Sequence, residues 1–272
     1  MKADLHVHST FSDGSSSIAQ LIGMAKENGL DCIAITDHDT LSHIRNIPAA
    51  GEIKVIGGVE MSAIHRNTGV KAHILGYNIQ KPGILSSFVQ PTLEARSRNS
   101  EKQIDILTGL GFKIDISNIP RTEEKYIYKQ HIMDWLFSTG QTSDMFGVFY
   151  QKTFKNGGAC AFDIEYPDVF EAVRAVKEAG GLAVLAHPGQ QNNFSLIPGL
   201  SQAGLDGLEL NHYSNNESDR KLIAAYAERY GLFLTGGSDY HGKYGAHHFN
   251  IGDFLSEESG IKGVEQSGVQ FV

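Results

Sequence analysis

The sequence is poor in cysteine and has no long apolar run. Only two of its 272 residues are cysteines, Cys32 and Cys160, and neither belongs to a CxxC pair, so we expect reduced thiols and no disulfide framework. No apolar stretch reaches the ~18 residues of a membrane span, and the first residues lack the apolar core of a signal peptide. We therefore expect a cytoplasmic protein with no membrane partner.

Basic residues form no cluster. The chain has 23 Lys and Arg residues and 31 Asp and Glu residues, which gives a formal net charge of −8. We therefore expect no electrostatic binding of long nucleic acid. Short anionic substrates remain compatible with this charge. Hydrophobic residues make up 41% of the chain, which is enough to bury one large core or two small ones. The oligomeric state stays open.

Histidine stands out instead. There are 12, and His6 and His8 are separated by a single residue. In a strand these two side chains project from the same face, which suits two ligands of one metal ion. An HxH pattern also occurs by chance in half-buried strands, so its meaning depends on the rest of the chain.

The apolar pattern predicts an α/β fold. Short apolar or β-branched runs alternate with stretches of helical spacing, which favours a mostly parallel sheet, and seven such runs favour a barrel over an open sheet. The predicted strands are Ala3–Val7, Cys32–Thr36, Lys54–Met61, Ala72–Tyr77, Leu182–Ala186, Gly207–Leu210 and Leu232–Thr235. Predicted helices between them include Val169–Ala179 and Asp219–Tyr230.

The alternation stops between roughly residues 82 and 167. Helical spacing there predicts helices at Leu93–Leu110, His131–Thr139 and Thr142–Lys152, without a convincing strand between them. We expect residues 82–167 to be an inserted helical subdomain that roofs the active site. Residues 1–81 and 168–272 would form the barrel.

Acidic residues and histidines follow most of the predicted strands. Reactive groups of barrel enzymes gather at the C-terminal ends of the strands, and this many polar groups in one mouth would need compensation by metal ions. The nine candidate ligands are His6, His8, Asp13, His38, Glu60, His73, His187, Asp239 and His241. Six imidazoles with three carboxylates suit Zn, Mn or Fe, and nine ligands with one bridging carboxylate suit three divalent ions.

Other polar residues have simpler interpretations. Asp39 is expected to cap a helix at Thr40–Ile47. His43 is expected on a loop or helix surface, and the pair His247 and His248 at the surface or in a lid.

The motifs together resemble one known family. HxHSxxSDG, ITDHDT, GVE, HILGY, AHPG and GGSDYHG, in this order, resemble the PHP (polymerase and histidinol phosphatase) family of metal-dependent phosphoesterases. The resemblance implies a distorted (β/α)7 TIM-like barrel with a trinuclear metal site. Carried over by position, it assigns one ion to His6, His8, Glu60 and Asp239, a second to Glu60, His73 and His187, and a third to Asp13, His38 and His241.

These assignments predict hydrolysis of a small phosphorylated substrate: a nucleotide bisphosphate, a cyclic nucleotide or a phosphomonoester. Two ions that share Glu60 would activate a bridging water as the nucleophile. His212, just past the sixth predicted strand, is the candidate proton donor or phosphate contact. Candidate substrate-binding residues are Ser12, Lys129 and His131. Related proteins often have Arg-x-His where this chain has Lys129 and His131, and lysine lacks the bidentate fork of arginine.

Three alternatives remain at this point. An exonuclease acting on short oligonucleotides would use the same metal ligands. Amidohydrolase-type C–N hydrolases also open with HxH, but they often use a metal-bridging lysine, and no predicted strand end here carries one. A non-catalytic metal-binding module is the third, and it is disfavoured because all nine ligand positions are filled.

Overall fold

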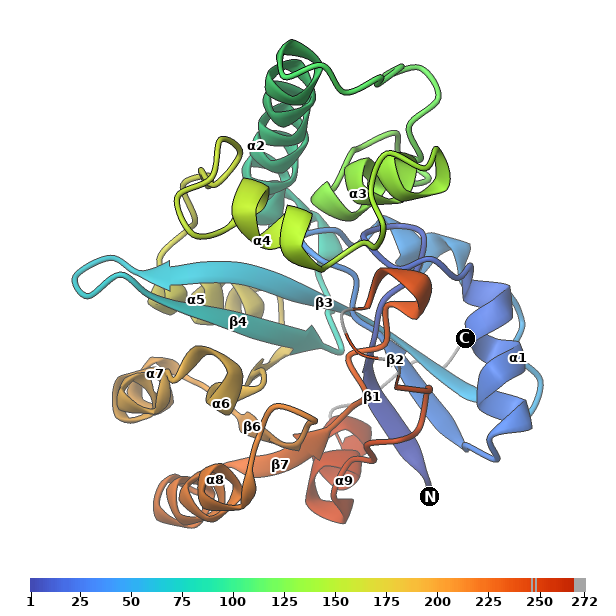
Figure 1. The fold of residues 1–272 in the computed structure, drawn as a ribbon. Helices are drawn as coiled ribbons and strands as arrows, with labels where there is room; N and C mark the ends of the chain where they lie inside the picture. Colours follow the sequence, from blue (N-terminus) through green and yellow to red (C-terminus); the bar gives the residue numbers. More distant parts are fainter. Residues whose placement is uncertain (246, 248, 267–272) are drawn as a thin grey trace.

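The structure is a computed structural model and describes residues 1–245, 247 and 249–266. Seven strands form one sheet in the order β1 to β7, curled into a nearly closed barrel with helices around it (Figure 1). The predicted α/β barrel is confirmed. The strands are β1 (Ala3–Val7), β2 (Cys32–Ile35), β3 (Lys54–His65), β4 (Val70–Tyr77), β5 (Leu182–Leu185), β6 (Gly207–Asn211) and β7 (Phe233–Gly236).

The helices cover the outside of the barrel and one of its ends. Around the sheet lie α1 (Ile18–Glu27), η1 (Ser42–Asn46), α5 (Val169–Glu178), α6 (Pro188–Gln191), η2 (Phe194–Leu196), α7 (Ile197–Ala203), α8 (Glu217–Tyr230), η3 (Gly242–Tyr244) and α9 (Glu258–Gln266). None of the helices in the described part of the chain combines the length and the apolar character that crossing a membrane requires.

The sheet is less uniformly parallel than the alternation predicts. β4 runs antiparallel to both of its neighbours, β3 and β5, whereas the other pairs are parallel. β3 continues to His65, past the predicted end at Met61, because its second half forms a long hairpin with β4. Glu60 therefore lies inside a strand and not at its end. In this hairpin Glu60 is opposite Leu75, and Ser62 is opposite His73.

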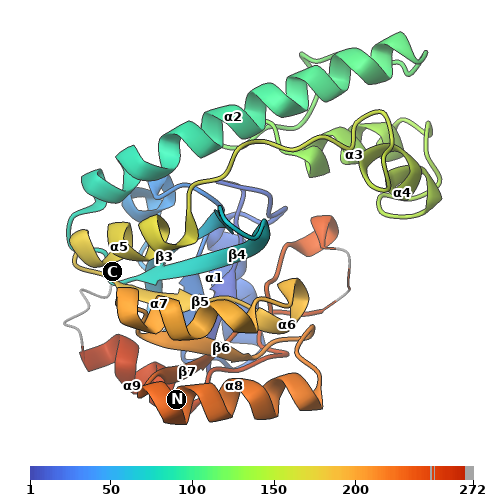
Figure 2. The ribbon, with the colours of Figure 1, turned by 90° about the vertical axis from the view of Figure 1, so that its left-hand side faces the viewer.

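Residues 82–167 contain helices and no strand. They are α2 (Pro82–Gly109), α3 (Lys129–Ser138) and α4 (Val148–Phe154), so α2 begins earlier and α4 later than predicted. Ile104, Leu107, Ile132 and Leu136 belong to a hydrophobic cluster of this segment that is separate from the clusters of the barrel. In Figure 2, α2 runs along one side of the barrel and carries α3 and α4 beyond its end.

The barrel closes where the chain after β7 approaches β1. His8 N donates to the carbonyl oxygen of Tyr240 over 2.9 Å, and Val7 forms a parallel bridge with the same residue. Gly237 makes this approach possible. A Cβ atom there would lie 2.3 Å from the Cβ of His6 and 2.5 Å from its backbone nitrogen, so no larger residue fits without moving β1.

Gly237→Ala should therefore destabilise the protein by about 1–3 kcal/mol, because the added methyl group overpacks the seam. Urea unfolding measures the change. The matched control is Gly23→Ala in α1, where an added Cβ meets no heavy atom within 4 Å. This control should stabilise the protein by roughly 0.5–1 kcal/mol. Equal stability of Gly237→Ala and the wild type would contradict the close approach.

Candidate metal centre

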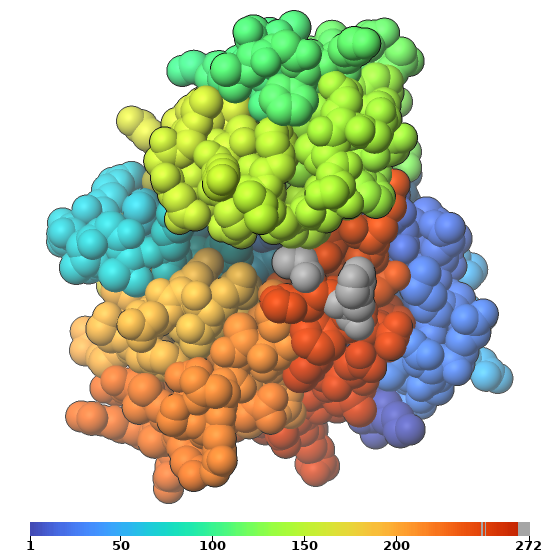
Figure 3. Space-filling model, in the orientation of Figure 1, coloured from blue at the N-terminus to red at the C-terminus, as the bar shows by residue number. Residues whose placement is uncertain are grey.

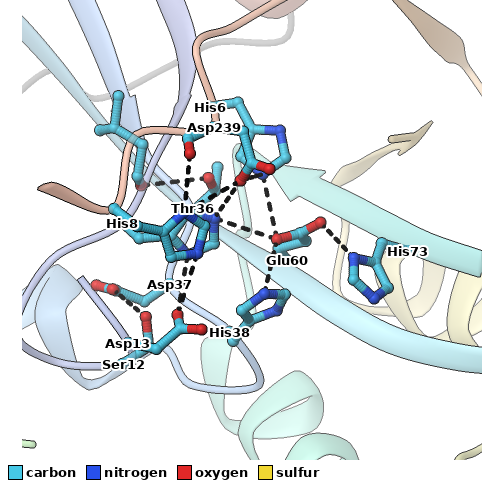
Figure 4. Close-up of polar contacts among 12 residues, drawn as sticks. His6, His8, Ser12, Asp13, Thr36, Asp37, His38, Glu60, His73 and Asp239 are labelled. Carbon is cyan, nitrogen blue, oxygen red and sulfur yellow. Dashed lines mark hydrogen bonds and ion pairs between the residues drawn. The ribbon is translucent and has the colours of Figure 1, made fainter. Parts of the chain in front are cut away.

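Glu60 lies at the centre of a cluster of histidines inside the barrel mouth (Figure 4). Its carboxylate is 1% exposed. Oε1 lies 2.7 Å from Nδ1 of His73 and 2.9 Å from Nε2 of His187. Oε2 lies 3.2 Å from the Nε2 atoms of three further histidines, which are His6, His8 and His38. The two oxygens of one carboxylate thus face two different sets of imidazoles.

Two aspartates complete the cluster. Oδ1 of Asp239 lies 3.4 Å from Nε2 of His6 and 3.2 Å from Nε2 of His8. Oδ1 of Asp13 lies 3.4 Å from Nε2 of His241 and 3.7 Å from Nδ1 of His8. All nine candidate ligands named from the sequence therefore come together, although the sequence separates them by more than 230 positions.

The backbone is strained where two of these residues leave their strands. His187 follows β5 with φ 25°, and Asp239 follows β7 with φ 49°. Positive φ is uncommon for residues other than glycine and costs about 1–3 kcal/mol. Such strain persists where the surrounding structure holds it in place, and it clusters at functional sites. Here it accompanies side chains that are directed at Glu60 and at His6 and His8.

Many polar atoms of the cluster are buried without a hydrogen-bond partner among the described residues. They are Nε2 of His6, both ring nitrogens of His8, Nδ1 of His38 and of His187, Oδ1 of Asp13 and of Asp239, and Oε2 of Glu60. An unpaired buried polar atom costs about 1–3 kcal/mol. Zinc–nitrogen bonds of ~2.0 Å in a tetrahedron place neighbouring ligand atoms roughly 3.3 Å apart. The residues present therefore fit metal ions.

The donor atoms group into several such sets. Each set has its ligand atoms within 4.8 Å of one another: His8, Asp13, His38 and His241; His6, His8, Glu60 and Asp239; His38, Glu60 and His73; and His6, His187 and Glu209. The overlap of these sets at Glu60 and at His8 suggests more than one ion. A mixed imidazole and carboxylate set suits borderline divalent metals.

Because the carboxylates and imidazoles of the cluster lie so close together, they shift one another's pKa values. Burial opposes protonation of His8, but Asp239 and Glu60 outweigh it and raise the pKa of His8 to about 10. Burial alone would raise the pKa of Glu60, yet the neighbouring imidazoles, His38 and His6 foremost, hold it well below its ordinary range. Burial lowers the pKa of His38 to about 3. A metal ion must displace the proton of His8, so binding is coupled to pH.

Glu209 is a functional candidate that the sequence argument missed. Its buried carboxylate lies 3.0 Å from Nδ1 of His6 through Oε1 and accepts the backbone N–H of His187 over 2.8 Å through Oε2. A carboxylate behind a ligating histidine fixes the ring orientation and leaves the other nitrogen free for a metal. The sequence feature that could have identified Glu209 is its position as a glutamate inside the apolar strand β6.

Asp37 is a second buried carboxylate that the sequence argument missed, and its partners are not candidate ligands. It accepts hydrogen bonds from Ser9 N and Oγ and from Ser12 Oγ, at 2.6–2.8 Å. His43 lies 3.2 Å from it and is fully buried, so its predicted surface position is wrong. The reason is that η1 folds His43 inward toward Asp37. Ser12 is likewise buried and held by Asp37.

Asp39 does not cap a helix. The segment that follows is the short 3₁₀ helix η1, with Leu41 at its N-cap position and no side-chain capping bond. Asp39 instead accepts the backbone N–H of Ser62 over 2.9 Å and pairs with Nη2 of Arg96 over 2.7 Å. A buried ion pair with a residue 57 positions away replaces the predicted local bond.

The helical segment 82–167 contacts the candidate ligands directly. The guanidinium of Arg96, in α2, lies 5.3 Å from the ring centre of Tyr128, whose hydroxyl donates to the carbonyl oxygen of His38 over 2.8 Å. Gln130 Nε2 donates to Oδ2 of Asp13 over 2.7 Å. The segment therefore packs on two of the nine cluster residues.

A pocket of about 490 Å³ opens beside the cluster. Gln130 and Lys155 line it, whereas Lys129 and His131 do not. Lys129 Nζ lies 5.8 Å from the ring centre of Phe154, and burial lowers its pKa to about 8. His131 Nδ1 accepts the backbone N–H of Tyr128, and burial lowers the pKa of this histidine to about 4.

His212 lies under the cluster. It is fully buried, and its Nε2 is 3.4 Å from Oδ2 of Asp239. Its Nδ1 lies 2.7 Å from Ser214 Oγ and accepts the backbone N–H of Ser214 over 3.2 Å, and an accepting Nδ1 places the proton of a neutral ring on Nε2. His212 does not line the pocket either, and its contact with the ligand cluster runs through Asp239.

Three characterised relatives resemble the chain over most of its length. A phosphoribosyl 1,2-cyclic phosphate 1,2-diphosphodiesterase from Eggerthella lenta is 42% identical over 90% of this chain and 96% of its own. A 5′-3′ exoribonuclease from Haemophilus influenzae is 28% identical over 88% and 90%, respectively. A 3′,5′-nucleoside bisphosphate phosphatase from Chromobacterium violaceum is 28% identical over 88% and 86%.

The fold also matches a crystal structure from Bifidobacterium adolescentis that is described as a metal-dependent phosphoesterase. The TM-score is 0.88 at 28% identity, over 98% of this chain and 96% of the other. Residues 4–247 match the family model of the PHP domain. Together with the buried histidine and carboxylate clusters, these matches establish that the chain belongs to the PHP domain family of metal-dependent phosphoesterases.

Proposed function

We propose that the chain binds three divalent ions, Zn, Mn or Fe, and hydrolyses an ester of a small phosphorylated metabolite. The observation that carries this proposal is the geometry of Glu60, whose two oxygens face separate sets of histidines. A carboxylate in this position is suited to bridge two ions.

The proposed ligand sets keep the partition that the resemblance implies, and the distances around Glu60, Asp13 and Asp239 support it except that the donor atoms group His38, and not His187, with Glu60 and His73. One ion would be held by His6, His8, Glu60 and Asp239, a second by Glu60, His73 and His187, and a third by Asp13, His38 and His241. Glu209 would orient His6 and the backbone of His187 from behind. When bound, the ions would supply Lewis-acid charge for the phosphoryl oxygens and acidify water for attack.

His212 is our candidate for delivering a proton to the leaving oxygen. The Ser214 N–H bond to Nδ1 keeps the proton on Nε2, at the edge of the ligand set beside Asp239. For contacts to phosphate we propose Lys155 and Gln130, because both line the pocket. The residues suggested by the sequence, Ser12, Lys129 and His131, do not line it. Lys155 is the only lysine among the described lining residues, and it lies in the insertion and not at a strand end.

A small substrate is supported by the pocket and by the insertion. The volume of about 490 Å³ lies within the range of small-molecule sites. In our proposal, residues 82–167 act as a subdomain that roofs this pocket, and Gln130 and Tyr128 hold it against the ligand cluster. The E. lenta and C. violaceum relatives are named for small phosphorylated substrates.

A 5′-3′ exoribonuclease acting on short RNA is the second candidate. The H. influenzae relative favours it, because that protein carries this activity in its name and matches the same residues of the chain. The net charge of −8 disfavours long nucleic acid, but not a short strand.

Reconstituted protein should contain about three ions per chain by elemental analysis, and chelation should lower its melting temperature. Glu60→Gln should lose at least one ion, because a neutral amide cannot bridge two cations. The control is Glu171→Gln, which removes only a surface pair with Arg66. One ion or fewer in the reconstituted wild type would contradict the proposal.

His212→Asn should lower kcat by about 100-fold or more through loss of the proton donor. The KM and the number of bound ions should stay close to those of the wild type. His65→Asn, at the tip of the β3–β4 hairpin, is the matched control and should retain full activity. Loss of metal from His212→Asn, with kcat restored at saturating metal, would instead make His212 a positioning residue for Asp239.

Hydrolysis of nucleoside bisphosphates or cyclic phosphates should have a higher kcat/KM than release of terminal nucleotides from a short 5′-phosphorylated RNA. Both rates can be measured by chromatography of the products under the same metal conditions. Equal or faster cleavage of the RNA would favour the exoribonuclease.

A further inference from the structure

The helical segment 82–167 forms hydrogen bonds with two candidate ligands, and both belong to the same proposed ion. Gln130 donates to Oδ2 of Asp13. The hydroxyl of Tyr128 donates to the carbonyl oxygen of His38. Asp13, His38 and His241, the third-ion set, are the ligands that we propose for the third ion. Within the described part of the chain, this segment forms no hydrogen bond with the other six candidate ligands, which are His6, His8, Glu60, His73, His187 and Asp239.

The same segment also holds the loop that carries the remaining member of the set. Two residues further along that loop, Lys243 Nζ lies 2.9 Å from both carboxylate oxygens of Asp134 in α3. The hydroxyl of Tyr244 donates to Oδ2 of Asp134 over 2.9 Å. His247 is exposed and lines the pocket, and His248 lies outside the described residues. Figure 3 shows the helical segment in direct contact with the chain that follows β7.

Polar contacts hold α3 against the barrel. The apolar clusters of the described residues connect the start of α2 to the barrel, through Leu85 and Val89. Residues of α3 and α4 belong instead to a cluster that contains no residue of the barrel. Polar interfaces between parts of one chain allow relative motion. The separation of α3 from the barrel would therefore expose no shared apolar core.

The contacts from this segment orient the ligands of the third-ion set. Gln130 occupies Oδ2 of Asp13, while Oδ1 is buried without a hydrogen-bond partner among the described residues. That oxygen lies 3.4 Å from Nε2 of His241. Tyr128, which is 1% exposed, fixes the backbone at His38. Partners that orient ligands from behind strengthen metal binding, because the ligands need not be ordered when the ion arrives.

We infer that binding of the third ion is thermodynamically coupled to docking of α3 on the barrel. Tyr128, Gln130 and Asp134 are then positioning residues for the third-ion set. Docked α3 strengthens binding of this ion, and by reciprocity the ion stabilises docked α3 by the same factor. This inference rests on the proposed three-ion function.

The coupling has two consequences for the site. Part of the binding free energy of the third ion is used to order α3, so this ion binds after the other two. Its binding also completes one wall of the pocket, because the helical segment provides five of the lining residues: Gln130, Phe146, Tyr150, Gln151 and Lys155.

Titration of chelator-treated full-length protein with Mn²⁺ measures the affinity of each ion by calorimetry. Gln130→Met and Tyr128→Phe should each weaken the third ion by about 10–100-fold and leave the first two unchanged. The matched controls are Gln90→Met and Tyr126→Phe. These two side chains bond to each other within the helical segment, so both controls should bind all three ions as the wild type does. No substrate is present, so a phosphate contact of Gln130 does not affect the result.

Asp134→Asn tests the contact near His241 without a change in an apolar core. The side chain of its partner Lys243 is 58% exposed, so we expect the variant to fold. It should weaken the third ion by about tenfold and leave the affinity of the first two ions unchanged.

The reciprocal effect can be measured at one backbone amide. Glu123 N–H donates to the carbonyl oxygen of Thr10 in the barrel over 3.1 Å, so its hydrogen exchange reports on docking of the segment just before α3. In the wild type, the third equivalent of Mn²⁺ should slow this exchange by about tenfold or more, and the first two should not. Gln130→Met should lose this protection.

Equal weakening of all three ions in Gln130→Met, or no weakening at all, would overturn the coupling and leave the proposed function intact. A wild type that binds one ion or fewer would contradict the proposed function. In that case, slower exchange of Glu123 on addition of Mn²⁺, lost in Gln130→Met, would still support the coupling. Exchange that does not change with Mn²⁺ would overturn it.

Discussion

The burial of charge around Glu60 is the constraint on which the rest of the structure depends. Three carboxylates and six imidazoles crowd together at the inner end of the pocket, and eight of their polar atoms are buried with no hydrogen-bond partner among the described residues. Such an arrangement is costly in a protein interior unless cations compensate it. The strained backbone at His187 and Asp239 and the supporting carboxylate of Glu209 both serve to hold donors toward this point.

The fold brings these donors together in two ways. The barrel closes tightly at Gly237, which presses the end of β7 against His6 and aligns Asp239 with the HxH pair. The β3–β4 hairpin reverses the chain, so that His73 faces the carboxylate of Glu60 from the neighbouring strand. Tyr128 and Gln130, from residues 82–167, form hydrogen bonds with His38 and Asp13 of the cluster, and the pocket beside them is lined by polar and aromatic residues.

The strands and the nine candidate ligands can be predicted from the sequence because short segments of the chain are enough to identify them. Most of the candidate ligands stand in or just after an apolar run, and the spacing of His6 and His8 alone places them on a common face. The features that it misses depend on partners far along the chain. Asp39 looks like a helix cap until Arg96 is placed beside it, and Glu209 becomes relevant only once β6 lies next to His6. In the same way, spacing cannot show that α3 presents Gln130, and not Lys129, to the pocket.

The central claim is that Glu60 bridges two ions of a three-ion site. Anomalous diffraction from crystals of the metal-loaded protein tests it most directly. Our account predicts three peaks, two of them on opposite oxygens of Glu60 and the third between Asp13, His38 and His241. A single peak, or a fully loaded site in which Glu60 contacts no more than one ion, would contradict it.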